Sequence, residues 1–214
     1  MAAKKTDNTI YKNADLAIHR MNKRSMRRFD RLKTFQDELN LIREIERVYL
    51  DGASEAVTEY VGLAVRAFTE ALVMCGKPHG TAERLARKYM TRDWVLEVLE
   101  MTDPVTRYVF STETERKAAR LSEAVAVPTA RQAEIERALR YWTKQTGQYA
   151  ITIVDQAMIA AFMVAGIKRV RWNTENDSAV CPICDKLDGR VFSIQNVPPK
   201  QHYNCRCWLT PYLH

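Results

Sequence analysis

Hydrophobic residues in most of this chain recur every three or four positions, the period of an amphipathic α-helix. Glycine and proline interrupt that pattern at intervals, and the residues beside them resemble helix starts and stops. The sequence therefore predicts a body of several helices rather than a sheet. The predicted helices cover residues 34–50, 53–75, 81–101, 104–125 and 128–166.

Four features fix the predicted ends of these helices. Thr34 is the expected cap of the first, which would turn Leu39, Ile42, Ile45 and Tyr49 inward and stop at Asp51-Gly52. The second ends at Gly76. Asp103-Pro104 has the form of an N-cap followed by proline at the first helical position. The last helix passes Gly147 and ends at Gly166, and its second half is apolar nearly all round, so we expect that half to be buried.

Beyond Gly166 the hydrophobic period shortens to two, as in β-strands. The runs KRVRW (168–172) and RVFSI (190–194) are predicted strands, with an Asp188-Gly189 turn just before the second. We thus expect a mainly α fold, a multi-helix body with a small C-terminal β-hairpin or ribbon tail. The expected divisions are a basic N-terminal arm (1–33), a helical body (34–166) and the tail (167–214).

The net charge of +7 arises entirely in the arm. Residues 1–33 hold ten Lys and Arg and three Asp, whereas the other positions hold equal numbers of basic and acidic residues. At helical spacing, six basic residues share one face, opposite Met21, Met26, Phe29 and Leu32. We expect this face to bind the backbone of DNA without sequence preference; an acidic protein surface or solvent alone are the alternatives. The six are Arg20, Lys23, Arg24, Arg27, Arg28 and Arg31.

Cysteines in this chain are expected to be reduced. No apolar run approaches the roughly 20 residues of a membrane span, and the lysines near the start have no apolar segment behind them. We therefore expect synthesis in the cytoplasm and no membrane span. Cysteine pairs in that compartment serve as metal ligands or catalytic groups more often than as disulfides.

The tail holds four of the five cysteines, in a spacing typical of zinc ligands. Cys181 and Cys184 are separated by two residues, as are His202 and Cys205, so two tight turns could present three thiolates and one imidazole to Zn²⁺. Cys207 is a surplus candidate that could replace Cys205 or His202. The three thiolates leave a charge of −1, which Lys186 and Arg206 could offset.

We expect this zinc to be structural and the chain to have no enzymatic activity. Neither a His-x-Glu nor a His-Glu-x-x-His motif of catalytic zinc sites is present. A tail this small cannot bury a core of its own, so a bound metal would be needed to hold its fold. Two alternatives stay open. One is a zinc-containing nuclease of the His-Asn-His type, for which only His214 is near enough in sequence to be catalytic. The other is a zinc-ribbon DNA-binding protein, for which the tail offers only scattered arginines.

The tail also resembles the C-terminal signature of phage head-morphogenesis proteins, the minor head proteins of the phage Mu F-like type. The resemblance covers residues 150–211. It departs from the family pattern between Asp177 and Cys181, where this chain has three residues (178–180) and the family has fewer. The matching positions are Gly166, Trp172, Thr174, Asp177, Cys181, Cys184, Leu187, Asp188, Gly189, Phe192, Pro199, His202, Asn204, Cys205, Arg206 and Cys207.

This resemblance implies a virion component present in few copies at the portal vertex or capsid interior. It implies portal, capsid and scaffold proteins as partners, and a role in head assembly, DNA packaging or DNA delivery. It implies no enzyme activity where no catalytic domain is fused. The arm and the helical body match no family, so their partners are expected on physical grounds alone.

Overall fold

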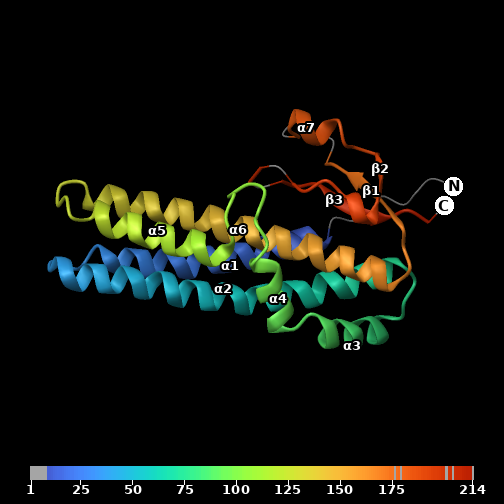
Figure 1. Cartoon of the computed structure of the whole chain (residues 1–214), viewed down its shortest axis with the longest axis horizontal. Coiled ribbons are helices and arrows are strands. Elements are labelled where there is room, and N and C mark those ends of the chain that lie inside the picture. The colour runs from blue at the N-terminus through green and yellow to red at the C-terminus, as the bar shows by residue number, and fades with distance from the viewer. Residues whose placement is uncertain (1–8, 176, 179, 201, 204, 214) are drawn as a thin grey trace.

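The computed structural model describes residues 9–175, 177, 178, 180–200, 202, 203 and 205–213. Within these residues the chain forms a long helical bundle with a small antiparallel sheet against one end (Figure 1). The predicted class, mainly α with a small C-terminal β tail, is confirmed. Four helices make up the bundle: α1 (Thr9–Leu32), α2 (Glu38–Met74), α5 (Phe110–Ala124) and α6 (Arg131–Val164).

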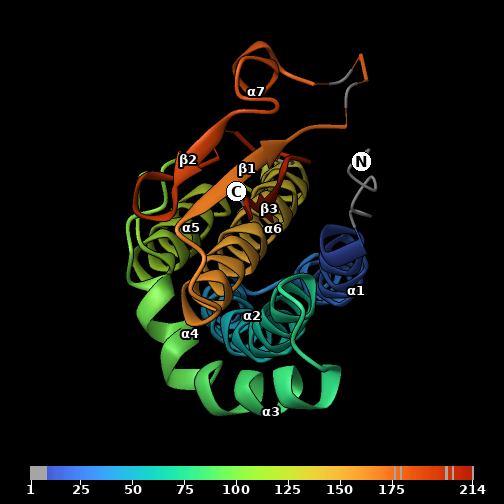
Figure 2. The ribbon, with the colours of Figure 1, turned by 90° about the vertical axis from the view of Figure 1, so that its right-hand side faces the viewer.

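Helices α2 and α6 form the centre of the bundle, and α1 and α5 flank them on opposite sides (Figure 2). The helix of the predicted basic arm therefore shares the core of the helical body. Ala14, Ala17, Phe29 and Leu32 of α1 are at most 1% exposed. Met26, which was expected on the same buried face, is instead 51% exposed.

The prediction that a helix ends at Asp51-Gly52 is wrong, because α2 continues through both residues. Gly52 allows a close approach instead. A Cβ at this position would lie 2.8 Å from Cζ2 of Trp142 on α6. Trp142 is itself fixed by an indole N–H donated to Ser25 of α1 at 2.9 Å and by edge contact with the Tyr49 ring. The glycine thus lets three helices meet around one buried tryptophan.

The start of α2 also differs from the prediction. Its cap is Asp37, which accepts the backbone N–H of Asn40 at 2.8 Å, whereas the Thr34 hydroxyl donates to the Arg31 carbonyl. Starting the helix at residue 38 places Leu39 on the outer face, where it is 68% exposed. The inward positions predicted at Ile45 and Tyr49 are confirmed, since both are buried.

Two further helix boundaries depend on side-chain caps. The predicted helix over 81–101 is two helices, α3 (His79–Tyr89) and α4 (Arg92–Leu99), because Thr91 caps the second by accepting the N–H of Trp94. Asp103 caps a turn and not a helix, through the N–H groups of Val105 and Thr106 at 2.9 and 2.8 Å. Helix α5 accordingly begins only at residue 110.

The prediction of one long final helix is confirmed, since α6 runs unbroken through Gly147 and the chain leaves it at Gly166 with φ of 77°. Most of its apolar second half is buried, although Met163 and Val164 at its end are 57% and 50% exposed. By length and composition α6 could cross a membrane. More than half of that stretch is buried within the bundle, and a core helix has the same composition, so this is weak evidence for a span.

The tail forms a sheet in the order β2-β1-β3, from β1 (Arg169–Asn173), β2 (Val191–Ser193) and β3 (Trp208–Pro211). Both predicted strands are confirmed, and β3 is a third that the sequence pattern did not indicate. Val170 pairs with Phe192 on one side and with Pro211 on the other. Val170 and Trp172 are buried, and β3 contacts α6. The sheet therefore fixes the tail to the body.

The contact between Gly52 and Trp142 generates a prediction about stability. Gly52→Ala forces the buried indole to shift, and we expect it to lower the free energy of unfolding by about 1–3 kcal/mol. Gly62→Ala is the matched control, because its Cβ would meet only the flexible Arg66 side chain at 3.5 Å. In that control the free energy of unfolding should rise by up to about 1 kcal/mol, because alanine has the higher helix propensity. Urea unfolding measures both, and equal gains in the two variants would contradict the close-approach role.

Candidate metal centre

The first half of the predicted zinc site lies on a single helical turn, α7 (Pro182–Asp185). Cys181 is the cap of this turn, and its sulfur accepts the backbone N–H of Cys184 at 3.3 Å. Pro182 at the first helical position needs no hydrogen-bond partner for its nitrogen, which favours this start. The turn brings both cysteine side chains to the same side.

The second half lies in the segment that leads into β3. The pairing of Trp208 and Leu209 with β1 draws this segment alongside α7. Nε2 of His202 then lies 3.4 Å from Sγ of Cys184, and Sγ of Cys205 lies 3.7 Å from the same atom. Residues separated by 18 and 21 positions are thereby brought together, as the spacing predicted.

These separations are those of ligands around one tetrahedral ion. Zinc bonds of ~2.3 Å to sulfur and ~2.05 Å to nitrogen place two sulfurs about 3.8 Å apart, and a sulfur and a nitrogen about 3.6 Å apart. The observed values of 3.7 and 3.4 Å are within about 0.2 Å of those expected. Three side chains of the predicted set therefore have the spacing of a metal site.

All five predicted ligands surround one small cavity. The ligand atoms form two groups, Cys181 with Cys184 and His202, and Cys184 with Cys205 and Cys207, and within each group they lie no more than 4.8 Å apart. The cavity between them is about 20 Å³, room for one occupant of the size of a water molecule. The cluster could therefore hold a metal ion.

The His202 ring is held in the form that a metal needs. Its Nδ1 lies 2.9 Å from the backbone carbonyl of Tyr203, and a carbonyl can only accept, so Nδ1 carries the proton. The lone pair is then on Nε2, the atom that faces Cys184. Such a hydrogen bond behind a ligating histidine fixes its tautomer and orientation.

Crowding separates the pKa values of the thiols. A hydrogen bond from the Cys207 thiol, together with the charge of Lys200, lowers the pKa of Cys205 to about 6. The same hydrogen bond and burial raise the pKa of Cys207, and burial is the main reason that the pKa of Cys184 rises to about 12. Without a cation only one of these thiols ionises readily, whereas a bound divalent ion would favour thiolates at its ligands.

A buried ion pair joins the centre to the helical body. Lys200, only 5% exposed, donates to Asp155 of α6 at 2.9 Å, and the Tyr11 hydroxyl of α1 donates to the same carboxylate. The Lys200 ammonium also lies 4.0 Å from the centre of the Tyr11 ring. The sequence analysis missed these residues. A lone aspartate in the apolar half of α6 was the signal, since a buried charge requires a partner.

The six basic residues predicted to bind DNA divide into two sets. Four pair with glutamates on α2: Arg20 with Glu59, Arg24 with Glu55 and Glu59, Arg28 with Glu55, and Arg31 with Glu44. Lys23 and Arg27 are exposed and have no ion pair with any residue that the structure describes. The basic face therefore contributes to helix packing as well as to surface charge.

Two other expectations bear on the tail. Arg206, expected to offset the charge of the site, makes a two-pronged pair with Asp177 at 2.6 and 2.7 Å. This pair links the loop before α7 to the segment that carries Cys205. His214, the catalytic candidate of the nuclease alternative, lies outside the described residues, as does Asn204 of the family signature.

Comparison with known proteins identifies the family. The profile described as "Phage Mu protein F like protein" matches residues 81–210. The match extends well beyond the tail and covers α3 to β3, including all five candidate ligands. No curated protein and no solved structure matches the chain. Because the profile covers more than half of the sequence, the chain belongs to the Phage Mu protein F-like family, a family of minor head proteins.

Proposed function

We propose that this protein is a non-enzymatic minor head protein that acts at the portal vertex or capsid interior, with its tail held by a structural zinc ion. The observation that carries the proposal is that His202 Nε2 and Cys205 Sγ lie at tetrahedral spacing from Cys184 Sγ, within the residues that match the family. Membership of a head-protein family supports the virion location and portal, capsid or scaffold partners. Four protein ligands around one ion support a structural role, because a catalytic zinc keeps an open coordination position.

The proposed ligands are Cys181, Cys184, His202 and Cys205. Bound there, zinc would supply four strong bonds that hold α7 and the segment before β3 together, which a sheet of three short strands cannot do by itself. Cys205 is preferred over Cys207 because its sulfur lies 3.7 Å from that of Cys184 and its thiolate is the favoured one. Cys207 then stays protonated and donates a hydrogen bond to the Cys205 sulfur, which is a supporting role for the fifth candidate.

Metal analysis of purified variants tests this ligand set. We expect about one zinc per chain in the wild type, little in Cys184→Ser or Cys205→Ser, and nearly full content in Cys207→Ser. Cys75→Ser is the matched control, since Cys75 lies at the end of α2 outside the cluster. If Cys207→Ser loses zinc and Cys205→Ser keeps it, then Cys207 is the ligand and Cys205 is the supporting residue. A wild-type chain without metal would contradict the proposal.

The location is tested in assembled particles. Heads produced with the wild-type chain should contain it in a few copies, and chemical crosslinking should join it to the portal protein. Cys184→Ser should reduce its incorporation, because a loosened tail presents a changed surface, whereas Cys75→Ser should be incorporated normally. Quantitative mass spectrometry of purified heads measures both. A chain that is made but absent from heads would contradict a virion role.

Contact with packaged DNA is proposed for the outer side of α1. Lys23 and Arg27 supply positive charge that no described carboxylate neutralises, and Arg20 and Arg31 remain 54% and 67% exposed beside their glutamates. Such a surface favours phosphate contacts that are independent of sequence and weaken with salt. Deletion of residues 1–33 is a poor test of this contact, because it removes part of the core.

Point variants test it without that loss. Lys23→Gln with Arg27→Gln should weaken binding to random duplex DNA and reduce the slope of log K against log salt by about 2, or ~0.9 for each lost phosphate contact. The control is Lys77→Gln with Arg92→Gln, which removes the same charge at exposed positions near α3 and α4. Fluorescence anisotropy at several salt concentrations gives both values. Equal losses in the two double variants would argue against a contact surface on α1.

A further inference from the structure

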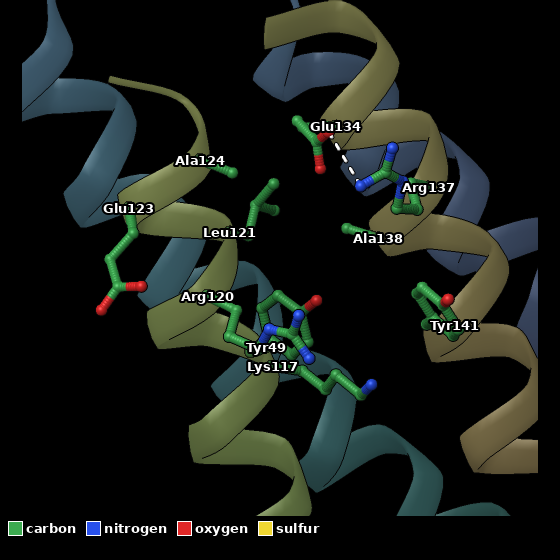
Figure 3. A pocket seen from close by; sticks show the side chains of 10 residues that line it. All are labelled: Tyr49, Lys117, Arg120, Leu121, Glu123, Ala124, Glu134, Arg137, Ala138 and Tyr141. Atoms are coloured by element: carbon green, nitrogen blue, oxygen red, sulfur yellow. Dashed lines mark ion pairs between the residues drawn. The ribbon is translucent and has the colours of Figure 1, made fainter. Parts of the chain in front are cut away.

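A second site lies at the end of the bundle away from the tail, between α5 and α6 (Figures 1 and 3). The cavity there has a volume of about 400 Å³, within the range of small-ligand sites. Tyr49 of α2 forms its floor. Leu121, Ala124 and Ala138 provide apolar walls, and the Tyr141 ring lies at its side. Neither the family match nor the metal centre gives this cavity a role.

The Tyr49 hydroxyl is an unused donor at the base of this cavity. The residue is only 2% exposed, and burial raises its pKa, so the hydroxyl keeps its proton. Among the residues that the structure describes, none makes a hydrogen bond with it. The hydroxyl oxygen is not among the fully buried polar atoms that lack a partner, so it faces the cavity that Tyr49 lines. It can therefore donate a hydrogen bond to an occupant of that cavity.

Two cations, Lys117 and Arg120, line the same cavity as the Tyr49 hydroxyl. The Lys117 side chain is only 15% exposed, and its ammonium lies 3.6 Å from the Glu113 carboxylate, beyond hydrogen-bond distance. That carboxylate is already bound by Arg116 at 2.8 Å. Arg120 points into the cavity (Figure 3) and has no ion pair within the described part of the chain. Three donors with unfilled capacity therefore converge on one space, an arrangement suited to an anion.

The surroundings favour one carboxylate over a chain of phosphates. Glu134 stands at the edge of the cavity, paired with Arg137 at 3.0 Å, and its charge would repel the neighbouring phosphates of a nucleic acid. The apolar walls and the Tyr141 ring, against which the Lys117 ammonium packs at 4.4 Å, suit a hydrophobic side chain next to the charge. Helices α1 and α5 are on opposite sides of the bundle (Figure 2), so this cavity is separate from the basic face of α1.

We propose that the cavity between α5 and α6 binds an acidic peptide segment of a partner protein, with one carboxylate held by Lys117, Arg120 and the Tyr49 hydroxyl and an adjacent apolar side chain against Leu121 and Tyr141. This surface would give the molecule a protein contact at the far end from its tail. The proposal does not depend on zinc or on DNA binding, and it predicts the chemistry of a partner that the family match leaves open.

Selection from a library of random ten-residue peptides tests the proposal on the full-length protein. Peptides recovered on the wild type should be enriched in Asp or Glu next to an apolar residue. The best of them should bind about tenfold or more weakly to Lys117→Met with Arg120→Gln, and several-fold more weakly to Tyr49→Phe, which removes only the hydroxyl. A peptide in which Asn or Gln replaces the Asp or Glu lacks the carboxylate. It should bind the wild type about tenfold or more weakly than the acidic peptide does.

Controls separate this site from general charge attraction. The Lys23→Gln, Arg27→Gln variant removes two cations elsewhere and should keep full affinity, and thermal unfolding confirms that each variant is folded. Tyr49→Phe provides the decisive comparison if the double variant is unstable. No acidic enrichment, or equal binding of the peptide to wild type and Tyr49→Phe, would overturn the proposal. Displacement of the peptide by a 20-bp duplex, in the α1 variant as in the wild type, would assign the cavity to nucleic acid instead.

Discussion

Four thiols and an imidazole around a cavity of about 20 Å³ impose the main physical constraint on the tail. Thiols this close cannot all ionise without a cation, which is why the pKa of Cys205 falls while those of Cys184 and Cys207 rise. A divalent ion bound here would remove that conflict and would bond both halves of the tail together.

The tail is fixed to the body on the side of the centre that carries Cys205. Lys200 and Asp155 form a buried pair there, and Tyr11 of α1 completes it. Removing one partner of such a pair would leave a buried charge uncompensated, so the docked position of the tail depends on all three side chains. The N-terminal helix, the last helix and the metal-binding segment thus meet at one place, and a change in any of them reaches the other two.

This arrangement gives a minor head protein distinct surfaces for distinct contacts. The tail lies against one end of the bundle, the connection between α5 and α6 lies at the other, and α1 runs along a side (Figures 1 and 2). A rigid bundle keeps such surfaces at fixed separations, because its core is packed around Trp142 and Gly52.

The sequence was most informative where chemistry depends on local spacing. The C-x-x-C and H-x-x-C pairs predicted four ligands, and the structure brings three of them, Cys184, His202 and Cys205, within 3.4–3.7 Å. The end of α6 near Gly166 was equally clear. It was misleading where a residue serves a distant partner. Gly52 resembles a helix breaker in the sequence. Its role is to leave room for the Trp142 ring, which lies 90 positions later in the chain. The glutamates of α2 that pair with the arginines of α1 could be recognised only once the two helices were known to be neighbours.

X-ray absorption at the zinc edge shows directly which atoms bind the ion. In the purified full-length protein we expect three sulfurs at ~2.3 Å and one nitrogen at ~2.0–2.1 Å. This shell should lose one sulfur in Cys205→Ser and stay unchanged in Cys207→Ser. A shell of oxygen ligands in the wild type, or of four sulfurs without nitrogen, would contradict the proposed centre.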